Sequence, residues 1–146
     1  IFGVSNFSVY QHQLLVSFLN IPIVSNHIDL NLLNTSALDN GIVDYIKQKY
    51  MRPLAVSPLA GGRIEHGTDE QALKLRKKLN EMAAKYDSNI ESVAVAWLIK
   101  LGALPLIGTL EENRIQNIVD AFEIEMDHQD WYELYNTSRP APAVLD

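Results

Sequence analysis

The sequence predicts an α/β fold organised around a parallel β-sheet, either covered by helices on both faces or closed into a barrel. Two observations support this fold class. Short apolar runs alternate four times with amphipathic stretches along the 146 residues, which is typical of βα units with parallel strands. Polar residues also follow each apolar run, where a strand would end and its loop begin. We therefore expect these loops to meet at one edge of the sheet.

The composition narrows the class of protein. An apolar fraction of 47% with 21% charged residues is that of a soluble globular domain. The net charge of −6 disfavours nucleic acid or an anionic membrane as a partner, and no run is long enough to span a membrane. We expect no signal peptide at the start of the chain. The absence of cysteine is what a cytoplasmic protein would show. Ile1 already belongs to a strand pattern, so we expect the sequence to begin inside a larger fold.

The first two βα units are visible in the apolar pattern. Residues 1–4 are predicted to form a strand, and Ser8-x-x-Gln11 is a capping box that starts a helix. One face of that helix carries Leu14, Leu15, Phe18 and Leu19. Residues 21–28 predict the second strand, and the spacing of apolar residues over 42–50 predicts the next helix.

The third and fourth units have a longer connection between their strands. Residues 54–56 predict a third strand, followed by a loop with three glycines. Two capping boxes, Thr68-x-x-Gln71 and Ser88-x-x-Glu91, predict the starts of two helices. The second of these ends at Gly102, and residues 104–107 then predict the fourth strand.

The C-terminal part is predicted to be helical. Thr109-x-x-Glu112 is a capping box. The apolar residues expected on the buried face of its helix are Ile115, Ile118, Val119 and Phe122. Asp127 is expected to cap a last helix, in keeping with a capping or surface role for Asp127, Asp130 and Glu133. A proline-rich extension then covers residues 139–146.

The Gly108-Thr109 turn before the helix has the character of an anion site. Glycine lets backbone come close to a ligand, and the unpaired N–H groups and dipole of a helix start favour phosphate. Arg114 can add a guanidinium to the same anion. The alternative is an ordinary helix cap with a solvated arginine. Gly61 and Gly62 follow the preceding strand, and barrel proteins commonly bind phosphate after their last two strands, so we favour a nucleotide site.

Four separated motifs resemble those of the aldo-keto reductases. They are Gly3-Val-Ser-Asn-Phe7, Asn26-His-Ile-Asp-Leu30, Ser57-Pro-Leu-Ala-Gly-Gly62 and Ile107-Gly-Thr-x4-Arg114. Their order and spacing are similar to those of the family from Ile1 to about Leu134. The resemblance implies the second half of a (β/α)8 TIM barrel, strands five to eight with their helices. Residues 1–146 would then be one partial barrel domain whose N-terminal half is absent from this chain.

The resemblance also implies the contacts of a bound NADP(H), with NAD(H) left open. Ser5 and Asn6 match the pair that binds the nicotinamide carboxamide, and His27 stands where the family usually has glutamine. Four residues match the loop over the pyrophosphate: Ser57, Leu59, Gly61 and Arg63. Three match the contacts to the phosphate and to the 2′-phosphate of NADP: Gly108, Thr109 and Arg114. Asn117 is the remaining candidate, for adenine, although the family often has Glu-Asn where this chain has Asn117-Ile118.

The resemblance implies that the family's catalytic tyrosine, lysine, aspartate and histidine lie in its N-terminal half. We therefore expect no catalytic residue here and no carbonyl reduction by this chain alone. We also expect no metal site, because the four histidines have no partner four residues on and there is no cysteine. Ser57 lacks the Gly-x-Ser-x-Gly elbow of a nucleophilic serine.

Two interpretations remain open. In the first, the chain is the NADP(H)-binding half of an oxidoreductase that reduces small aldehydes or ketones. In the second, it is a noncatalytic half-barrel that binds nucleotide or a protein partner and associates with itself. Four strands of an eight-stranded barrel leave two unpaired edges and an open apolar interior. Either a missing N-terminal half or a second copy of the chain is expected to cover them.

Overall fold

A computed structural model describes residues 1–139 of the chain. Its centre is a four-stranded parallel sheet in the order β1-β2-β3-β4, which confirms the predicted α/β class. The strands are β1 (Phe2–Ser5), β2 (Ile23–Asp29), β3 (Arg52–Val56) and β4 (Leu104–Pro105). β4 is shorter than the four residues expected. Leu106 still donates its N–H to the carbonyl of Ala55 at 2.9 Å, but the chain then leaves the sheet.

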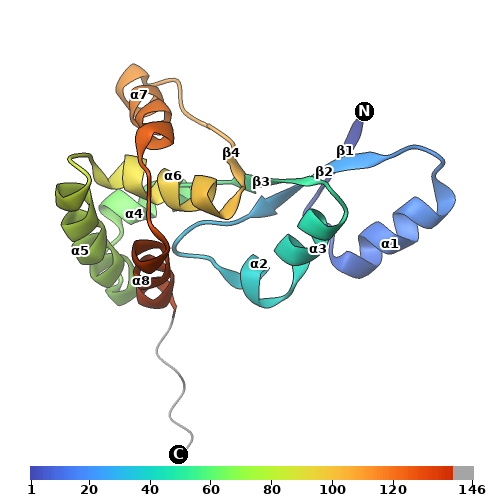
Figure 1. Ribbon diagram of the computed structural model, residues 1–146, viewed down its shortest axis with the longest axis horizontal. Coiled ribbons are helices and arrows are strands. Elements are labelled where there is room, and N and C mark those ends of the chain that lie inside the picture. Colours follow the sequence, from blue (N-terminus) through green and yellow to red (C-terminus); the bar gives the residue numbers. More distant parts are fainter. Residues whose placement is uncertain (140–146) are drawn as a thin grey trace, which may run out of the picture.

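Helices connect the strands and lie around the sheet (Figure 1). They are α1 (Val9–Phe18), α2 (Ser36–Asp39), α3 (Ile42–Gln48), α4 (Arg63–His66), α5 (Glu70–Lys85), α6 (Ile90–Leu101), α7 (Glu112–Asp120) and α8 (His128–Ser138). Two short 3-10 segments are η1 (Ala60–Gly62) and η2 (Ala121–Glu123). The sequence pattern did not indicate α2, α4, η1 or η2, because a single turn is too short to show a helical period.

Local capping explains where the helices begin. Ser8 and Gln11 form the expected capping box of α1, and Asp127 caps α8 as expected. The caps predicted at Thr68 and Ser88 are wrong by one residue, since Asp69 caps α5 and Asn89 caps α6. Asp is a better cap than Thr, whereas Ser and Asn are about equal, so the choice of Asn89 depends on how the preceding loop enters the helix.

The cap predicted at Thr109 is also wrong. The residue that precedes α7 is Glu111, which makes no side-chain cap. The hydroxyl of Thr109 instead accepts the N–H of Glu111 at 3.1 Å. It therefore shapes the turn before α7 rather than closing the helix itself.

The core lies between the sheet and α3, α5, α6 and α8. Helix α6 is its centre, because every residue from 91 to 98 is buried. Trp97 of α6 stacks on Trp131 of α8, with ring centroids 5.1 Å apart and planes 6° from parallel. Each indole N–H also donates to the other residue's carbonyl oxygen, at 3.2 Å and 3.0 Å. This pair fixes α8 against the buried helix.

The helices that follow the two edge strands are covered less than expected. In α7 only Ile118 is buried, whereas Ile115 and Val119 are exposed. Phe122, in η2, is exposed too, so the predicted buried face is mostly wrong. In α1, Leu14 and Phe18 are exposed and His12 is the buried residue. The physical reason is the same on both sides, because no described element lies beyond β1 or β4 to cover these faces.

Candidate functional site

The carboxyl ends of the strands lie at one edge of the sheet, and the predicted site residues follow them. β1 and β2 are in register so that Ser5 pairs with His27. Residues after β3 and β4 meet around a cavity of about 360 Å³, which we call the β3–β4 cavity. Six of the predicted residues line it: Ser57, Leu59, Gly61, Gly108, Thr109 and Arg114.

The wall of the β3–β4 cavity is built from backbone and small side chains. Ser57 and Gly61 both have positive φ, at 52° and 61°. The carbonyl of Ser57 accepts the side-chain amide of Asn31 at 3.1 Å, which holds the turn after β3 in place. A Cβ built on Gly108 would meet no atom within 4 Å, so its backbone faces open space. A ligand can therefore approach the main chain closely at this turn.

Arg114 gives the cavity its charge. Among the described residues that line it, Arg114 alone is charged. Its side chain is 30% exposed. Its Nε and Nη2 each lie 2.9 Å from one carboxylate oxygen of Glu91. The chemistry that fits this wall is a phosphate group held by backbone and a forked guanidinium.

Asn117 does not line the β3–β4 cavity. Its side-chain NH₂ donates to Glu91 at 2.8 Å, and its side-chain oxygen accepts the amide of Asn89 at 3.1 Å. Its backbone carbonyl accepts the hydroxyl of Ser92 at 2.7 Å. The residue proposed for adenine is thus engaged in joining α6 to α7.

The three predicted nicotinamide contacts lie at the ends of β1 and β2. Ser5 and Asn6 are exposed and His27 is half-buried. Asn6 has a φ of 54° and donates its N–H to the carbonyl of His27 at 2.7 Å. The fully buried amide of Asn26 bonds both the N–H and the carbonyl of Phe7, at 3.4 Å and 2.9 Å. These bonds fix the loop that carries Ser5 and Asn6.

Further hollows extend along the same edge. One of about 630 Å³ is lined by Asn6, Asp29 and Asn34 among others. Another, of about 370 Å³, shares Asp29 and Asn34 with it and also includes Arg63. This second hollow shares Ser57 and Gly61 with the β3–β4 cavity. Neighbouring hollows therefore follow the strand ends from β1 to β4, as an elongated ligand would require.

Arg63, which lines one of these hollows, already forms an ion pair. Its guanidinium lies 3.0 Å from the carboxylate of Asp69, the cap of α5. That bond and the guanidinium charge keep the pKa of Asp69 below its ordinary value. Both side chains are about half exposed, so the pair leaves Arg63 within reach of solvent and of a ligand.

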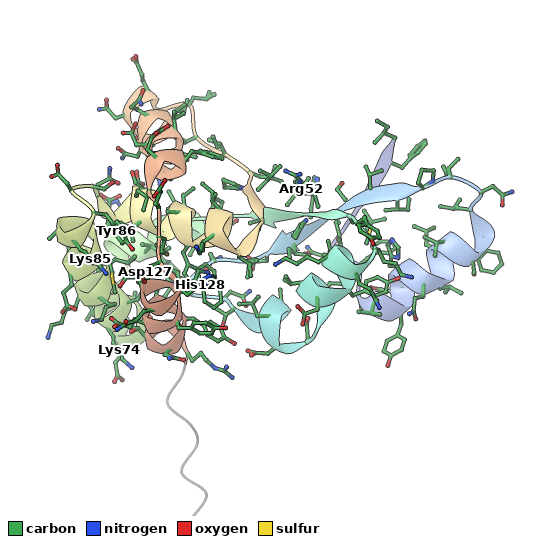
Figure 2. The ribbon with its side chains drawn as sticks, in the orientation of Figure 1. Arg52, Lys74, Lys85, Tyr86, Asp127 and His128 are labelled. Atoms are coloured by element: carbon green, nitrogen blue, oxygen red, sulfur yellow. The ribbon has the colours of Figure 1, made fainter. Side chains whose placement is uncertain are left out.

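A tyrosine, a lysine and an aspartate also meet at the junction of α5 and α8, where Figure 2 labels the tyrosine, Tyr86, and the lysine, Lys85. Buried Asp130 accepts the hydroxyl of Tyr86, and it accepts Lys85 at 2.6 Å. Burial and the bond to Asp130 raise the pKa of Tyr86 above its ordinary value, so this phenol is a poorer acid than a free one. None of the three lines the β3–β4 cavity. The cluster is a helix-to-helix contact and not a proton donor for that site.

Within residues 1–139, no three His, Cys, Asp or Glu side chains are grouped so that they could hold a metal ion. In that same part of the chain, no helix has the length and apolarity needed to cross a bilayer.

Two residues in this region were not singled out from the sequence. The sequence predicts Glu91 as part of a capping box, and because Ser92 separates it from the apolar run that begins at Val93, nothing in the pattern indicates that its carboxylate is buried. Asn26 was noted only as part of a motif. Apart from its position beside His27, nothing in the sequence indicates that the side-chain amide of Asn26 is buried.

The geometry defines a parallel α/β domain with a phosphate-compatible cavity at the carboxyl edge of its sheet. Residues 1–138 match the model of the aldo/keto reductase family, and the chain belongs to this family. It is 34% identical over 135 residues to 6-dehydroglucose reductase of Agrobacterium fabrum, covering 91% of this chain and 44% of that protein. It is 33% identical to oxidoreductase YdhF of Escherichia coli, with 91% and 45% covered.

Solved structures agree with the fold. A thermostable aldo-keto reductase in complex with the inhibitor epalrestat superposes with a TM-score of 0.78 at 22% identity, over 92% of this chain and 47% of that one. An aldo-keto reductase complexed with NADPH gives a TM-score of 0.78 at 25% identity, over 92% and 41%. The chain thus spans a little less than half the length of the relatives it matches.

Proposed function

We propose that this chain is the cofactor-binding half of an NADP(H)-dependent aldo-keto reductase that reduces small aldehydes or ketones. Its four strands would correspond to strands five to eight of a (β/α)8 barrel, with residues 1–146 forming one partial domain. The observation that carries the proposal is the β3–β4 cavity, where small residues and backbone surround one guanidinium. The open space at Gly108 suits a phosphate group close to the main chain.

Different residues of the site would contact different parts of the nucleotide. Gly108, Thr109 and Arg114 would bind the phosphates of the adenosine end, with Arg114 on the 2′-phosphate of NADP. Ser57, Leu59, Gly61 and Arg63 would border the pyrophosphate. Ser5, Asn6 and His27 would orient the nicotinamide amide, since each side chain can donate or accept a hydrogen bond. A bound nucleotide would supply the hydride, and Ser5, Asn6 and His27 would hold its amide in place.

We propose that the chain alone does not reduce carbonyls. An alkoxide that forms at neutral pH needs a proton donor close by. At the nicotinamide end, the hollow that contains Asn6 is lined by one tyrosine, the exposed Tyr10, and no lysine is among the described residues that line it. Tyr86 is held elsewhere with a raised pKa. The donor would come from the other half of the barrel.

A second candidate, a self-associating half-barrel without catalysis, is favoured by the uncovered faces at both edges of the sheet. Helix α1 exposes Tyr10, Leu14 and Phe18. Helix α7 exposes Ile115 and Val119, and η2, which follows it, exposes Phe122. Apolar stripes beside unpaired strands favour burial against another part of a barrel. Native mass spectrometry separates the two candidates. A homodimer of the 146-residue chain supports self-association, and a longer polypeptide or a second, different piece supports the reductase.

Replacing Arg114 tests the nucleotide site. Arg114→Ala should weaken NADPH binding roughly tenfold to a hundredfold more than NADH binding, because a charge-assisted hydrogen bond to phosphate contributes about 1.5–3 kcal/mol. Isothermal titration calorimetry with both nucleotides measures the difference. Arg52→Ala is a matched control, since Arg52 is exposed on β3 (Figure 2) and lines none of the three hollows along the carboxyl edge. Equal losses for the two nucleotides would remove Arg114 from the 2′-phosphate.

A further inference from the structure

Glu91 is a buried carboxylate directly behind the proposed nucleotide site. It lies in the first turn of α6, and its side chain is only 7% exposed. One of its oxygens accepts Nε and Nη2 of Arg114, both at 2.9 Å, and the other accepts the amide of Asn117 at 2.8 Å. A buried carboxylate is strongly unfavourable unless it is paired in this way. The pairing therefore fixes the position of Arg114 as well as that of Glu91.

Arg114 keeps part of its binding capacity in this arrangement. A guanidinium has five N–H donors. Nε of Arg114 donates to Glu91, and Nη2 lies 2.9 Å from the same carboxylate oxygen. In residues 1–139 the guanidinium makes no other side-chain hydrogen bond, and the side chain lines the β3–β4 cavity. A bound phosphate would meet a guanidinium that is already oriented. It would also meet the negative charge of Glu91 immediately behind that guanidinium.

We infer that Glu91 is a positioning residue that limits how strongly this site prefers a nucleotide with a 2′-phosphate over one without it. The inference rests on the proposed function. The ion pair of Arg114 with Glu91 has no net charge, so a phosphate gains directed hydrogen bonds but little long-range attraction. A nucleotide with a free 2′-hydroxyl lacks the negative charge of the 2′-phosphate, so Glu91 has little effect on its binding affinity. The carboxylate of Glu91 thus reduces the difference in binding affinity between a nucleotide with a 2′-phosphate and one without it.

The variant Glu91→Gln tests this inference because it removes the charge and keeps the shape and one acceptor for Arg114. It should raise the preference for NADPH over NADH by about three- to tenfold, the effect of one partly screened charge near a phosphate. Glu123→Gln is the matched control, since Glu123 is an exposed acid in η2 and should leave the ratio unchanged. Calorimetric dissociation constants for both nucleotides give the ratio without any measurement of turnover.

A double-mutant cycle tests the charge of Glu91 in the absence of Arg114. In the Arg114→Ala background the carboxylate has no guanidinium to neutralise it, so Glu91→Gln should still raise the preference for NADPH over NADH. A preference that Glu91→Gln leaves constant or lowers in the wild-type background would overturn the inference while the proposed function stands.

The wild-type protein provides a measurement that needs no variant to fold. Its own preference for NADPH should stay below about a hundredfold, because the hydrogen bonds of one paired arginine provide no more than that. A preference for NADPH greater than this limit would overturn the inference and leave the proposed function standing. If the wild-type protein binds neither nucleotide, the proposed function is wrong and the inference falls with it.

Discussion

The stacked tryptophans give a direct test of what holds α8 to the domain. Trp131→Ala removes a half-buried indole, its face-to-face contact with Trp97 and the N–H that donates to the carbonyl of Trp97, while the carbonyl of residue 131 that accepts the indole of Trp97 remains. Truncating a buried tryptophan costs about 3–5 kcal/mol, and partial exposure favours the lower end, so we expect a loss of about 3 kcal/mol. In a domain of this size, that loss lowers the Tm by roughly 6–12 °C.

Trp131→Phe is the matched variant. It keeps an aromatic ring against Trp97 and loses the indole N–H that donates to the carbonyl of Trp97 at 3.0 Å. One net hydrogen bond and some ring contact correspond to about 1–2 kcal/mol. The alanine variant should therefore be clearly less stable than the phenylalanine variant.

Urea denaturation followed by tryptophan fluorescence provides the assay. The chain contains two tryptophans, and both are in this pair. In either variant the signal therefore comes from Trp97 alone, which is fully buried in the folded state. If Trp131→Ala changed the free energy of unfolding by less than about 1 kcal/mol, or matched Trp131→Phe, the pair would not be what anchors α8.

Two further predictions concern pH and a glycine. Burial, and then the charge of Lys49, lower the pKa of His12 below its ordinary value of 6.5. As the pH falls below about 6.5, the imidazole of His12 takes up a proton in the unfolded chain before it does so in the folded chain. Acidification therefore lowers the free energy of unfolding, by at most about 1.4 kcal/mol per pH unit. The difference in unfolding free energy between about pH 7.5 and about pH 5.5 should be larger for wild type than for His12→Leu, and equal slopes would contradict this. Gly67→Ala should destabilise by about 1–3 kcal/mol, because its Cβ would lie 2.6 Å from the carbonyl oxygen of Arg63. Gly108→Ala has open space and should leave the Tm unchanged in thermal melts, and a similar Tm for both variants would refute the steric argument.

The short turns and the ends of elements could be predicted only in part. Capping chemistry is local, so Ser8 and Asp127 were correctly identified as caps. Where two polar residues stand side by side, as at Thr68-Asp69, the sequence does not say which oxygen reaches the free N–H. That choice depends on how the preceding loop enters the helix, and it is made by tertiary contacts.

The candidate site, too, could be predicted from the sequence only in part. The residues around Gly108 and after Val56 could be expected to meet, because the carboxyl ends of neighbouring parallel strands share one edge. The partner of Arg114 could not be expected, since Glu91 is 23 residues away and on another helix. Periodicity within one helix carries no information about which side chain of a second helix will face it.

By itself, the sequence determined the parallel α/β class, the order of the four βα units and the set of turns that carry the candidate nucleotide contacts. These features follow from local apolar period and from turn residues, which act over a few positions. Only the tertiary structure decided that Glu91 orients Arg114, that Asn26 supports the loop after β1, and that the apolar faces of α1 and α7 remain uncovered. The physical reason is that burial and pairing depend on what packs across the fold, and residues distant along the chain provide those neighbours.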